Sequence, residues 1–341
     1  MLQRREWLTS SLLLLLTGCQ KSRPRTSHTS NDRIVLYCAQ DLEYIETILQ
    51  DFRQATGMKV DIKGDTESNK TVGLFESVRR ERQQPRADVF WSNEPVLMQR
   101  LSAEGLLERY QSPSAKDYPG SSRPADACWQ GFAARARILL VARALAAKER
   151  PQGIQDLTNP KWQGRIAMAK PFFGSTASHM ACLCSSMGEL SFKSFCQQLK
   201  PQVALLPGNK DVARAVAQGR YHVGLTDTDD AIIEVIHGFP VEMVFPDQST
   251  CGTLLLPNAI ALVKNGPNPQ AGKQLIDYVL SADVEKQLAE GPSAQIPLNP
   301  KVQAKHRLAL APTLKTMQVD FVNAAQNWDV TQRIMREVFS S

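Results

Sequence analysis

The sequence predicts an α/β protein with two lobes, each a mixed sheet flanked by helices. Three observations support this prediction. The chain has 341 residues, of which 43% are hydrophobic and 22% charged, a composition typical of a soluble globular protein with room for two cores. Segments typical of strands and helices alternate from residue 34 to residue 95. They alternate again from residue 131 to residue 225.

The first alternation begins with a β-branched apolar run at residues 34–38, which predicts a strand. Hydrophobic residues then recur with helical spacing up to Gly57, a typical C-cap residue. Residues 58–62 alternate like a second strand, so the three elements form a β-α-β unit with parallel strands. The pattern continues with a helix at 71–83, a strand at 87–91 and a helix that begins with Ser92-Asn93-Glu94-Pro95.

The second alternation begins at the apolar segment 131–142, which predicts a strand although it carries Arg135 and Arg137. Further strands are expected at 165–169, 203–206 and 221–225, and helices at 180–187 and 211–218. Beyond residue 246 we expect strands at 252–257 and 259–263, helices at 270–280 and 284–290, and an amphipathic helical tail within 311–339.

The formal net charge of +6 is concentrated at the N-terminus. Residues 1–25 carry five basic side chains and one acidic side chain, which leaves 35 basic and 33 acidic residues in the rest of the chain. The body is therefore close to neutral, and it has no basic stripe interleaved with aromatic residues of the kind that contacts phosphate backbones. We expect no nucleic-acid partner.

Residues 1–18 have the features of a secretory signal peptide. Basic residues precede the apolar run 12–16, which is too short to cross a bilayer because spanning takes about 20 residues. Leu16-Thr17-Gly18-Cys19 resembles the bacterial lipobox, whose cysteine is lipidated; the alternative is a signal peptide with a chance cysteine. We expect residues 19–31 to tether the body to a membrane, outside the cytoplasm. The six remaining cysteines are expected to be free thiols, with disulfides as the alternative.

Six short segments stand out along the body: 36–41 (LYCAQD), 52–57 (FRQATG), 87–92 (ADVFWS), 105–107 (GLL), 157–164 (LTNPKWQG) and 293–297 (SAQIP). In this order they resemble the extracellular solute-binding proteins of ABC importers, and more narrowly the ferric-ion-binding branch. The resemblance implies a clamshell of the periplasmic-binding-protein type II, with lobe 1 at residues 32–128 plus 246–295 and lobe 2 at residues 129–245 plus 296–341.

The same resemblance implies how the protein works. The ligand is held between the lobes, the lobes close around it by a hinge motion, and the closed form docks on an ABC permease in the inner membrane. It implies a monomeric binding protein that needs no cofactor and is not an enzyme.

Polar residues follow the predicted strands at four places, and ligands of α/β lobes gather at such strand ends. These places are Gln40-Asp41, Ser92-Asn93-Glu94, Gly174-Ser175-Thr176 and the segment 226–230. The last contains Asp227, Asp229 and Asp230, whose like charges repel one another. Asp227 as a helix cap is one explanation, and a cation in the cleft is the other.

The resemblance places two adjacent tyrosines of the ferric-binding relatives at Asp229 and Asp230, their histidine at Asp41, and their glutamate at Asn93 beside Glu94. This chain therefore replaces phenolate oxygens by carboxylate oxygens, which also suit hard cations such as iron(III), Mn(II), Mg(II) and Ca(II). We predict Asp41, Glu94, Asp229 and Asp230 as metal ligands, with Asn93 in support.

A second group of polar residues is suited to an anion that accompanies the cation. Ser175 and Thr176 begin a predicted helix, and Asn209 begins another, so hydroxyls and free backbone N–H groups are expected there. Ordinary N-capping is the alternative. Arg135 is expected either to pair with such an anion or to bridge to a carboxylate.

Two rival functions follow from the same residues. Trp91 and Trp129 beside carboxylates suit an organic cation, and the helix starts suit a small phosphorylated solute. A metal needs converging oxygens, whereas an amine needs an aromatic wall. An extracellular enzyme is the rival of a different class, but the sequence has neither a G-x-S-x-G nor an H-E-x-x-H motif.

Overall fold

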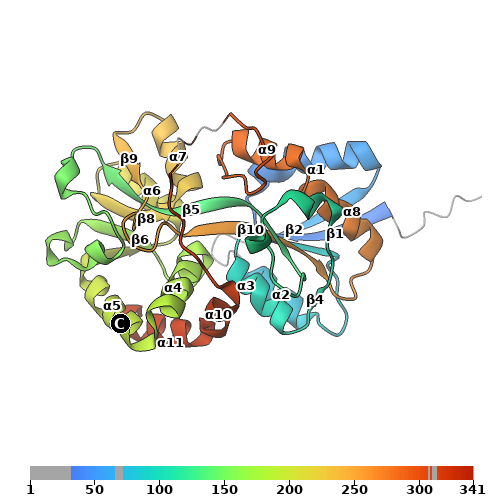
Figure 1. Ribbon diagram of the computed structural model, residues 1–341, viewed down its shortest axis with the longest axis horizontal. Coiled ribbons are helices and arrows are strands. Elements are labelled where there is room, and N and C mark those ends of the chain that lie inside the picture. The colour runs from blue at the N-terminus through green and yellow to red at the C-terminus, as the bar shows by residue number, and fades with distance from the viewer. Residues whose placement is uncertain (1–31, 66–71, 306–307, 309–312, 341) are drawn as a thin grey trace, which may run out of the picture.

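The computed structural model describes residues 32–65, 72–305, 308 and 313–340 (Figure 1). The predicted signal peptide, Cys19 and the tether lie outside the described residues. Within these residues, ten strands form one sheet in the order β2-β1-β3-β10-β5-β8-β6-β7, with β4 beside β10 and β9 beside β5. Figure 1 shows this sheet continuing through two lobes with helices packed around each, which confirms the predicted two-lobed mixed α/β fold.

Lobe 1 contains the β-α-β unit predicted from the first alternation. Its central strand β1 pairs in parallel with β2 and β3, and the first helix ends at Gly57 in the left-handed conformation (φ 72°). The strands are β1 Arg33–Cys38, β2 Lys59–Gly64, β3 Val89–Ser92 and β4 Leu107–Glu108; the helices are α1 Leu42–Thr56, α2 Val72–Arg80, α3 Pro95–Ala103, α8 Pro269–Val279 and α9 Ala282–Glu290.

Lobe 2 repeats the alternation, with β6 paired in parallel to both β7 and β8. Strand β9, which has no counterpart in the sequence prediction, pairs antiparallel with β5. The strands are β6 Ile166–Ala169, β7 Val203–Leu206, β8 Val223–Asp227 and β9 Val241–Val244; the helices are α4 Gly174–Met187, α5 Glu189–Leu199, α6 Asn209–Ala217, α7 Thr228–Ile236 and α11 Trp328–Phe339.

Two long antiparallel strands, β5 Gln130–Ala142 and β10 Leu255–Val263, connect the lobes. The first half of β5 pairs with β10, and its second half pairs with β8 and β9 of lobe 2. The expected division into strands 252–257 and 259–263 is wrong, because one strand continues through a register shift between Pro257 and Asn258. The buried Asn258 amide compensates for the irregularity by donating to the Ala133 carbonyl at 2.5 Å and to Gln295 Oε1 at 2.7 Å.

The C-terminal segment is less helical than its amphipathic pattern predicts. Residues 315–317 instead exchange backbone hydrogen bonds with Thr253. Helix α10 Phe321–Gln326 begins only where the Asp320 carboxylate accepts the N–H groups of Val322 and Asn323. This short helix packs against α3 of lobe 1 and α4 of lobe 2, so it joins the lobes at their side, as Figure 1 shows.

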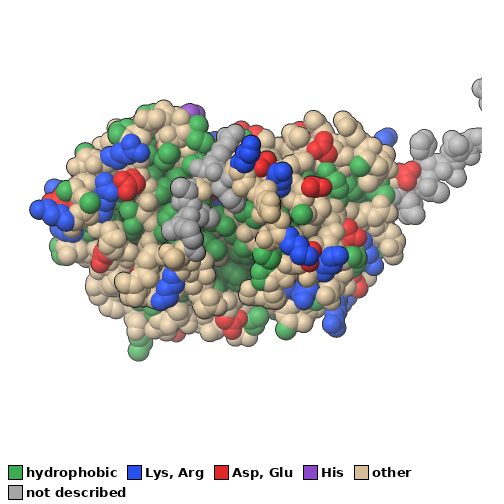
Figure 2. Space-filling model, turned by 45° about the horizontal axis from the view of Figure 1, so that its top comes forward, with side chains coloured by type: hydrophobic (Ala, Val, Ile, Leu, Met, Phe, Trp, Pro, Cys, Tyr) green, Lys and Arg blue, Asp and Glu red, His purple; other side chains and the backbone are tan. Residues whose placement is uncertain are grey.

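The surface of the described body carries charges of both signs, and its thiols are free. On the face that Figure 2 shows, acidic and basic side chains are interspersed over both lobes. Within the described ranges, no helix has the length and apolar character needed to span a bilayer. All six cysteines of the body are free, as expected, and Cys38, Cys182, Cys184 and Cys196 are buried.

Candidate functional site

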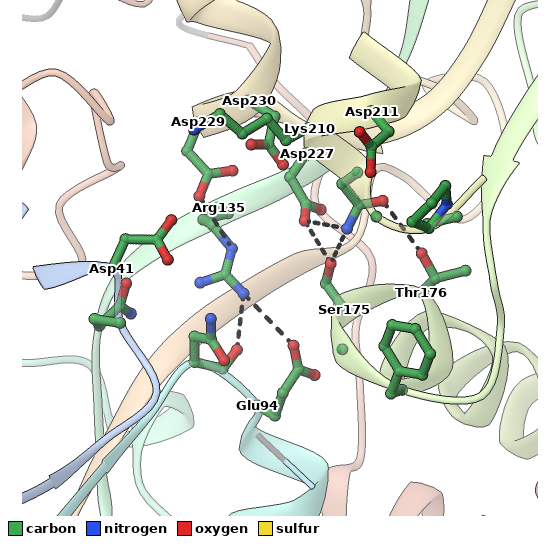
Figure 3. A pocket seen from close by; sticks show the side chains of 18 of the residues that line it. Asp41, Glu94, Arg135, Ser175, Thr176, Lys210, Asp211, Asp227, Asp229 and Asp230 are labelled. Carbon is green, nitrogen blue, oxygen red and sulfur yellow. Dashed lines mark hydrogen bonds and ion pairs between the residues drawn. The ribbon is translucent and has the colours of Figure 1, made fainter. Parts of the chain in front are cut away.

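A cavity of about 120 Å³ lies between the lobes, where the carboxyl ends of strands from both lobes meet. All ten residues that the sequence predicts for the binding site line this cavity (Figure 3): Asp41, Asn93, Glu94, Arg135, Ser175, Thr176, Asn209, Asp227, Asp229 and Asp230. The structure therefore brings together residues from six chain segments that are separate in the sequence.

Local structure explains why these side chains reach the cavity. Asp41 is the N-cap residue of α1 after β1, Glu94 is the N-cap residue of α3 after β3, and Asp227 joins β8 to α7. On lobe 2, Gly174 adopts a positive φ of 63° and begins α4 just before Ser175. Each residue thus lies at a strand end that leads into a helix N-terminus, the usual ligand position in α/β lobes.

Three carboxylates of lobe 2 form the acidic side of the cavity. Asp227, Asp229 and Asp230 each offer an oxygen within 4.8 Å of the others, close enough to share one metal ion. Figure 3 shows Asp41 of lobe 1 directed toward the same space from the opposite side. Asp227 occupies the N-cap position of α7, but its side chain makes no capping hydrogen bond, so helix capping does not explain this cluster.

Arg135 extends from the crossing strand β5 between the carboxylates of the two lobes. Its guanidinium lies 3.8 Å from Glu94 Oε1 of lobe 1 and 3.7 Å from Asp229 Oδ2 of lobe 2, and it donates to the Asn93 carbonyl at 2.8 Å. Of the two expectations for Arg135, the structure shows the bridge to carboxylates. A ligand cation in this cavity therefore competes with the buried guanidinium of Arg135 for the carboxylates of Glu94 and Asp229.

Arg137 organises the lobe 2 wall, and the sequence analysis did not include it in the site. This fully buried residue donates to Asp227 Oδ1 at 2.7 Å, to Ser175 Oγ and Asn209 Oδ1 at 3.2 Å each, and to Thr176 Oγ1 at 3.2 Å. Ser175 Oγ also donates to Asp227. Alternation along β5 placed Arg137 on the same face as Arg135, and this was the signal that could have revealed it.

The Arg137 network engages most of the residues expected to bind an anion. The hydroxyls of Ser175 and Thr176 and the amide of Asn209 bond to one another and to Arg137, so they hold the starts of α4 and α6 together. Asp227 is charge-paired within this network, whereas Asp229 and Asp230 are directed toward the cavity in Figure 3.

Burial changes the acidity of two cavity carboxyls. Glu94 is 1% exposed; burial raises its pKa to about 7, against the opposing charge of Arg135, and its Oε2 accepts a hydrogen bond from Ser178. Burial likewise raises the pKa of Asp229 to about 6. Glu94 Oε1 and Asp229 Oδ1 are buried and have no hydrogen-bond partner among the residues that the structure describes. Such oxygens are suited to accept a positive charge from a ligand.

Trp91 and Trp129, the tryptophans expected beside an organic cation, are not among the described residues that line the cavity. Trp91 is fully buried in the lobe 1 core beside Phe132, and Trp129 donates to Gln99 Oε1 at 2.9 Å while packing on Phe321. The aromatic residues that do line the cavity are Tyr44 and Phe173. The two tryptophans therefore do not form the wall that the organic-amine alternative expects of them.

Comparisons with known proteins identify the family and the fold of this chain. Residues 34–290 match the family model described as bacterial extracellular solute-binding protein. Iron uptake protein A1 of Synechocystis sp. is 26% identical over 286 residues, which cover 79% of this chain and 78% of that protein. Iron-bound HitA from Pseudomonas aeruginosa has a TM-score of 0.80 at 20% identity, covering 89% of this chain and 99% of its own.

A further solved structure, AfuA from Actinobacillus pleuropneumoniae with bound fructose-6-phosphate, has a TM-score of 0.77 at 23% identity and covers 89% of this chain and 97% of its own. The two structures show that this chain shares their fold. The resemblance inferred from the six sequence segments is confirmed: the chain belongs to the bacterial extracellular solute-binding protein family.

Proposed function

We propose that this protein captures a hard metal cation, iron(III) foremost, between its lobes and delivers it to an ABC permease. The observation that carries this proposal is the convergence of Asp41 of lobe 1 with Asp229 and Asp230 of lobe 2 on one cavity. Oxygen-only donor sets favour hard cations. The name of the Synechocystis relative supports iron as the cargo.

The two-sided arrangement also suggests how capture is coupled to closure. Asp41 belongs to lobe 1 and the Asp229–Asp230 pair to lobe 2, so one cation contacts all three only when the lobes are together. A ligand shifts a conformational equilibrium by its differential affinity, so the cation stabilises the closed form that a permease recognises. We propose that the protein acts as a monomer outside the cytoplasm, held to a membrane by lipid on Cys19, and binds its cargo without catalysing a reaction.

Elemental analysis tests the proposal directly. Protein isolated without chelators is expected to contain about one equivalent of metal and to lose it to a strong chelator. Re-addition of iron(III) as its nitrilotriacetate complex is then expected to raise the melting temperature, because a ligand that binds only the folded state stabilises it. A metal-free protein that carries an organic molecule and shows no such rise contradicts the assignment.

A small phosphorylated solute is the second candidate, favoured by one feature of lobe 2. The starts of α4 and α6 both border the cavity, and Lys210 lies beside them. Helix N-termini bind phosphate groups through free backbone N–H groups and the helix dipole. Mass spectrometry of the isolated protein distinguishes this candidate, since it predicts a bound organic phosphate in the absence of metal.

The ligand-free protein is expected to lose stability as the pH rises from about 4 to about 8. The pKa values of Glu94 and Asp229 are raised in the folded state, to about 7 and about 6. These carboxyls therefore stabilise the fold while they are protonated, and this contribution, on the order of 1–3 kcal/mol, is lost as the pH passes through these values. Denaturant unfolding of metal-free protein across this range measures the loss.

The matched variants are Glu94→Gln and Glu108→Gln, since Glu108 is an exposed glutamate of the same lobe. Glu94→Gln is expected to flatten the pH profile and Glu108→Gln to leave it unchanged. Identical profiles for Glu94→Gln and the wild type contradict the prediction. Cation affinity is expected to rise over the same pH range, because binding requires the ionised carboxylates.

A further inference from the structure

A basic surface lies at the end of lobe 1 that is remote from the cleft. Strand β1 begins there at Arg33 and runs toward the cavity, where Asp41 follows its other end. Figure 1 shows the described chain beginning on the side of lobe 1 that points away from lobe 2. The sheet edge at which β1 begins is therefore the part of the body that directly follows residues 19–31 in the sequence.

Hydrogen bonds hold three chain segments together at this edge. The buried Asp88 carboxylate accepts the N–H groups of Val35, at 2.8 Å, and of Asn268. The Asn268 amide in turn donates to the Arg33 carbonyl at 2.9 Å. The Val263 N–H donates to the Asp88 carbonyl, also at 2.9 Å. The start of β1, the residue before β3 and the end of β10 therefore form one fixed surface.

Three basic residues, Arg82, Arg86 and Lys264, lie around this surface, and we call them the basic edge. Arg86 stands shortly before β3, and Lys264 directly follows β10. Arg82 and Lys264 line one shallow cavity of about 210 Å³. All three are exposed, and none makes a side-chain hydrogen bond or an ion pair with another described residue. Their charges are therefore available to a partner.

Three acidic groups near the basic edge are engaged by other partners. Asp88 is fully buried and accepts backbone N–H groups, Asp61 pairs with Arg33, and Glu81 accepts the Tyr37 hydroxyl. These carboxylates therefore do not form ion pairs with the three residues of the basic edge. A net positive charge remains on the surface, as an anionic partner requires.

We propose that the basic edge docks on the anionic headgroups of a lipid bilayer. The segment that directly precedes β1, residues 19–31, adds Lys21, Arg23 and Arg25 and contains no acidic residue. Its 13 residues can span at most about 45 Å, so a lipid on Cys19 holds the basic edge within that distance of the headgroups. Clusters of Lys and Arg beside a membrane anchor are attracted to anionic lipids.

This inference rests on the proposed location outside the cytoplasm, and it does not depend on the identity of the cargo. A lipid anchor by itself leaves open which side of the body faces the bilayer, whereas a basic edge selects one side. The basic edge belongs to lobe 1 alone and lies at the opposite end of β1 from the cavity. Opening and closing of the lobes therefore leaves the contact with the bilayer unchanged.

Vesicle co-sedimentation tests the docking. The probe is the mature chain from residue 19 with Cys19→Ser, which carries no lipid. Binding is expected to vesicles of equimolar phosphatidylcholine and phosphatidylglycerol and not to vesicles of phosphatidylcholine alone. It is expected to fall more than about tenfold as the salt concentration rises from about 0.1 M to about 1 M, because salt screens exposed charges.

The variant that tests the basic edge combines Arg82→Gln, Arg86→Gln and Lys264→Gln. It is expected to bind the anionic vesicles more than about tenfold more weakly than the wild type. The matched control replaces three exposed basic residues of lobe 2 and removes the same net charge. This control combines Arg143→Gln, Lys148→Gln and Arg220→Gln, and it is expected to bind as the wild type does.

Each other result overturns the docking. Equal losses in the two triple variants mean that net charge alone attracts the protein, and an unchanged affinity in the basic-edge variant means that another surface binds. Binding to pure phosphatidylcholine, or to neither kind of vesicle, contradicts recognition of anionic headgroups. None of these results involves the cleft, so capture of the cation is tested separately by the elemental analysis.

Discussion

Replacement of both Asp229 and Asp230 by alanine is expected to abolish the rise in melting temperature that the captured cation causes. These residues supply two of the three carboxylates of the lobe 2 cluster, and the third, Asp227, is already paired with Arg137. At a ligand concentration 1,000 times the Kd, binding stabilises the folded state by about 4 kcal/mol. That corresponds to a shift of roughly 10 °C in a domain of this size, and the double variant is expected to lose nearly all of it.

The matched control removes two other carboxylates of lobe 2. Glu189 and Glu337 form exposed ion pairs with Arg333 and Lys193, far from the cleft lining. Their replacement by alanine is expected to cost at most about 1 kcal/mol per pair and to leave the ligand-induced shift unchanged. Scanning calorimetry of both double variants, with and without iron(III) nitrilotriacetate, measures the ligand-induced shift in melting temperature. An unchanged shift in the Asp229/Asp230 variant would remove these residues from the site.

Replacement of Arg137 by methionine is expected to destabilise the protein by about 3–5 kcal/mol, because it leaves the buried Asp227 carboxylate without its counter-charge. The substitution also removes the hydrogen bonds that the Arg137 guanidinium donates to Ser175, Thr176 and Asn209. Cation affinity is expected to fall as well, since the lobe 2 wall loses its order. Equilibrium unfolding in denaturant provides the free energy, and titration of folded protein provides the affinity.

Two further variants separate charge from packing. Combination of Arg137→Met with Asp227→Asn removes both charges and is expected to recover much of the lost stability, because an unpaired buried charge is the main cost. Arg333→Met, which removes an exposed partner of Glu189, is expected to cost at most about 1 kcal/mol. A loss of less than about 1 kcal/mol in Arg137→Met contradicts the structural role assigned to this residue.

Local sequence signals predicted most of the elements because they depend on neighbouring residues. Helical spacing that ends at Gly57 and the alternation in residues 58–62 reflect side chains packing against one core, and both elements form as expected. These signals failed where a residue that is distant in the sequence determines the backbone conformation. Strand β10 continues through Pro257 because the Asn258 side chain pairs with Ala133 and Gln295. Residues 315–317 are extended because Thr253 takes their backbone hydrogen bonds.

The same division holds for the site. The position of acidic residues at the ends of strands is readable along the chain, since parallel strands bring their carboxyl ends to one edge. The sequence does not show whether an acidic side chain can bind a ligand, because this depends on which positively charged side chain lies beside it in space. Asp227 resembles its two neighbours in sequence, yet Arg137 from a strand 90 residues away pairs with it.

The sequence by itself therefore determined the two α/β lobes and the polar residues at the strand ends, since periodicity and strand-end position are local properties, and its resemblance to known proteins indicated the family. The tertiary structure alone decided that Arg135 lies between the acids, that Arg137 neutralises Asp227, and that Tyr44 borders the cleft. The reason is physical: charge pairing and burial act between atoms that are close in space, and their partners come from segments that the order of residues does not relate.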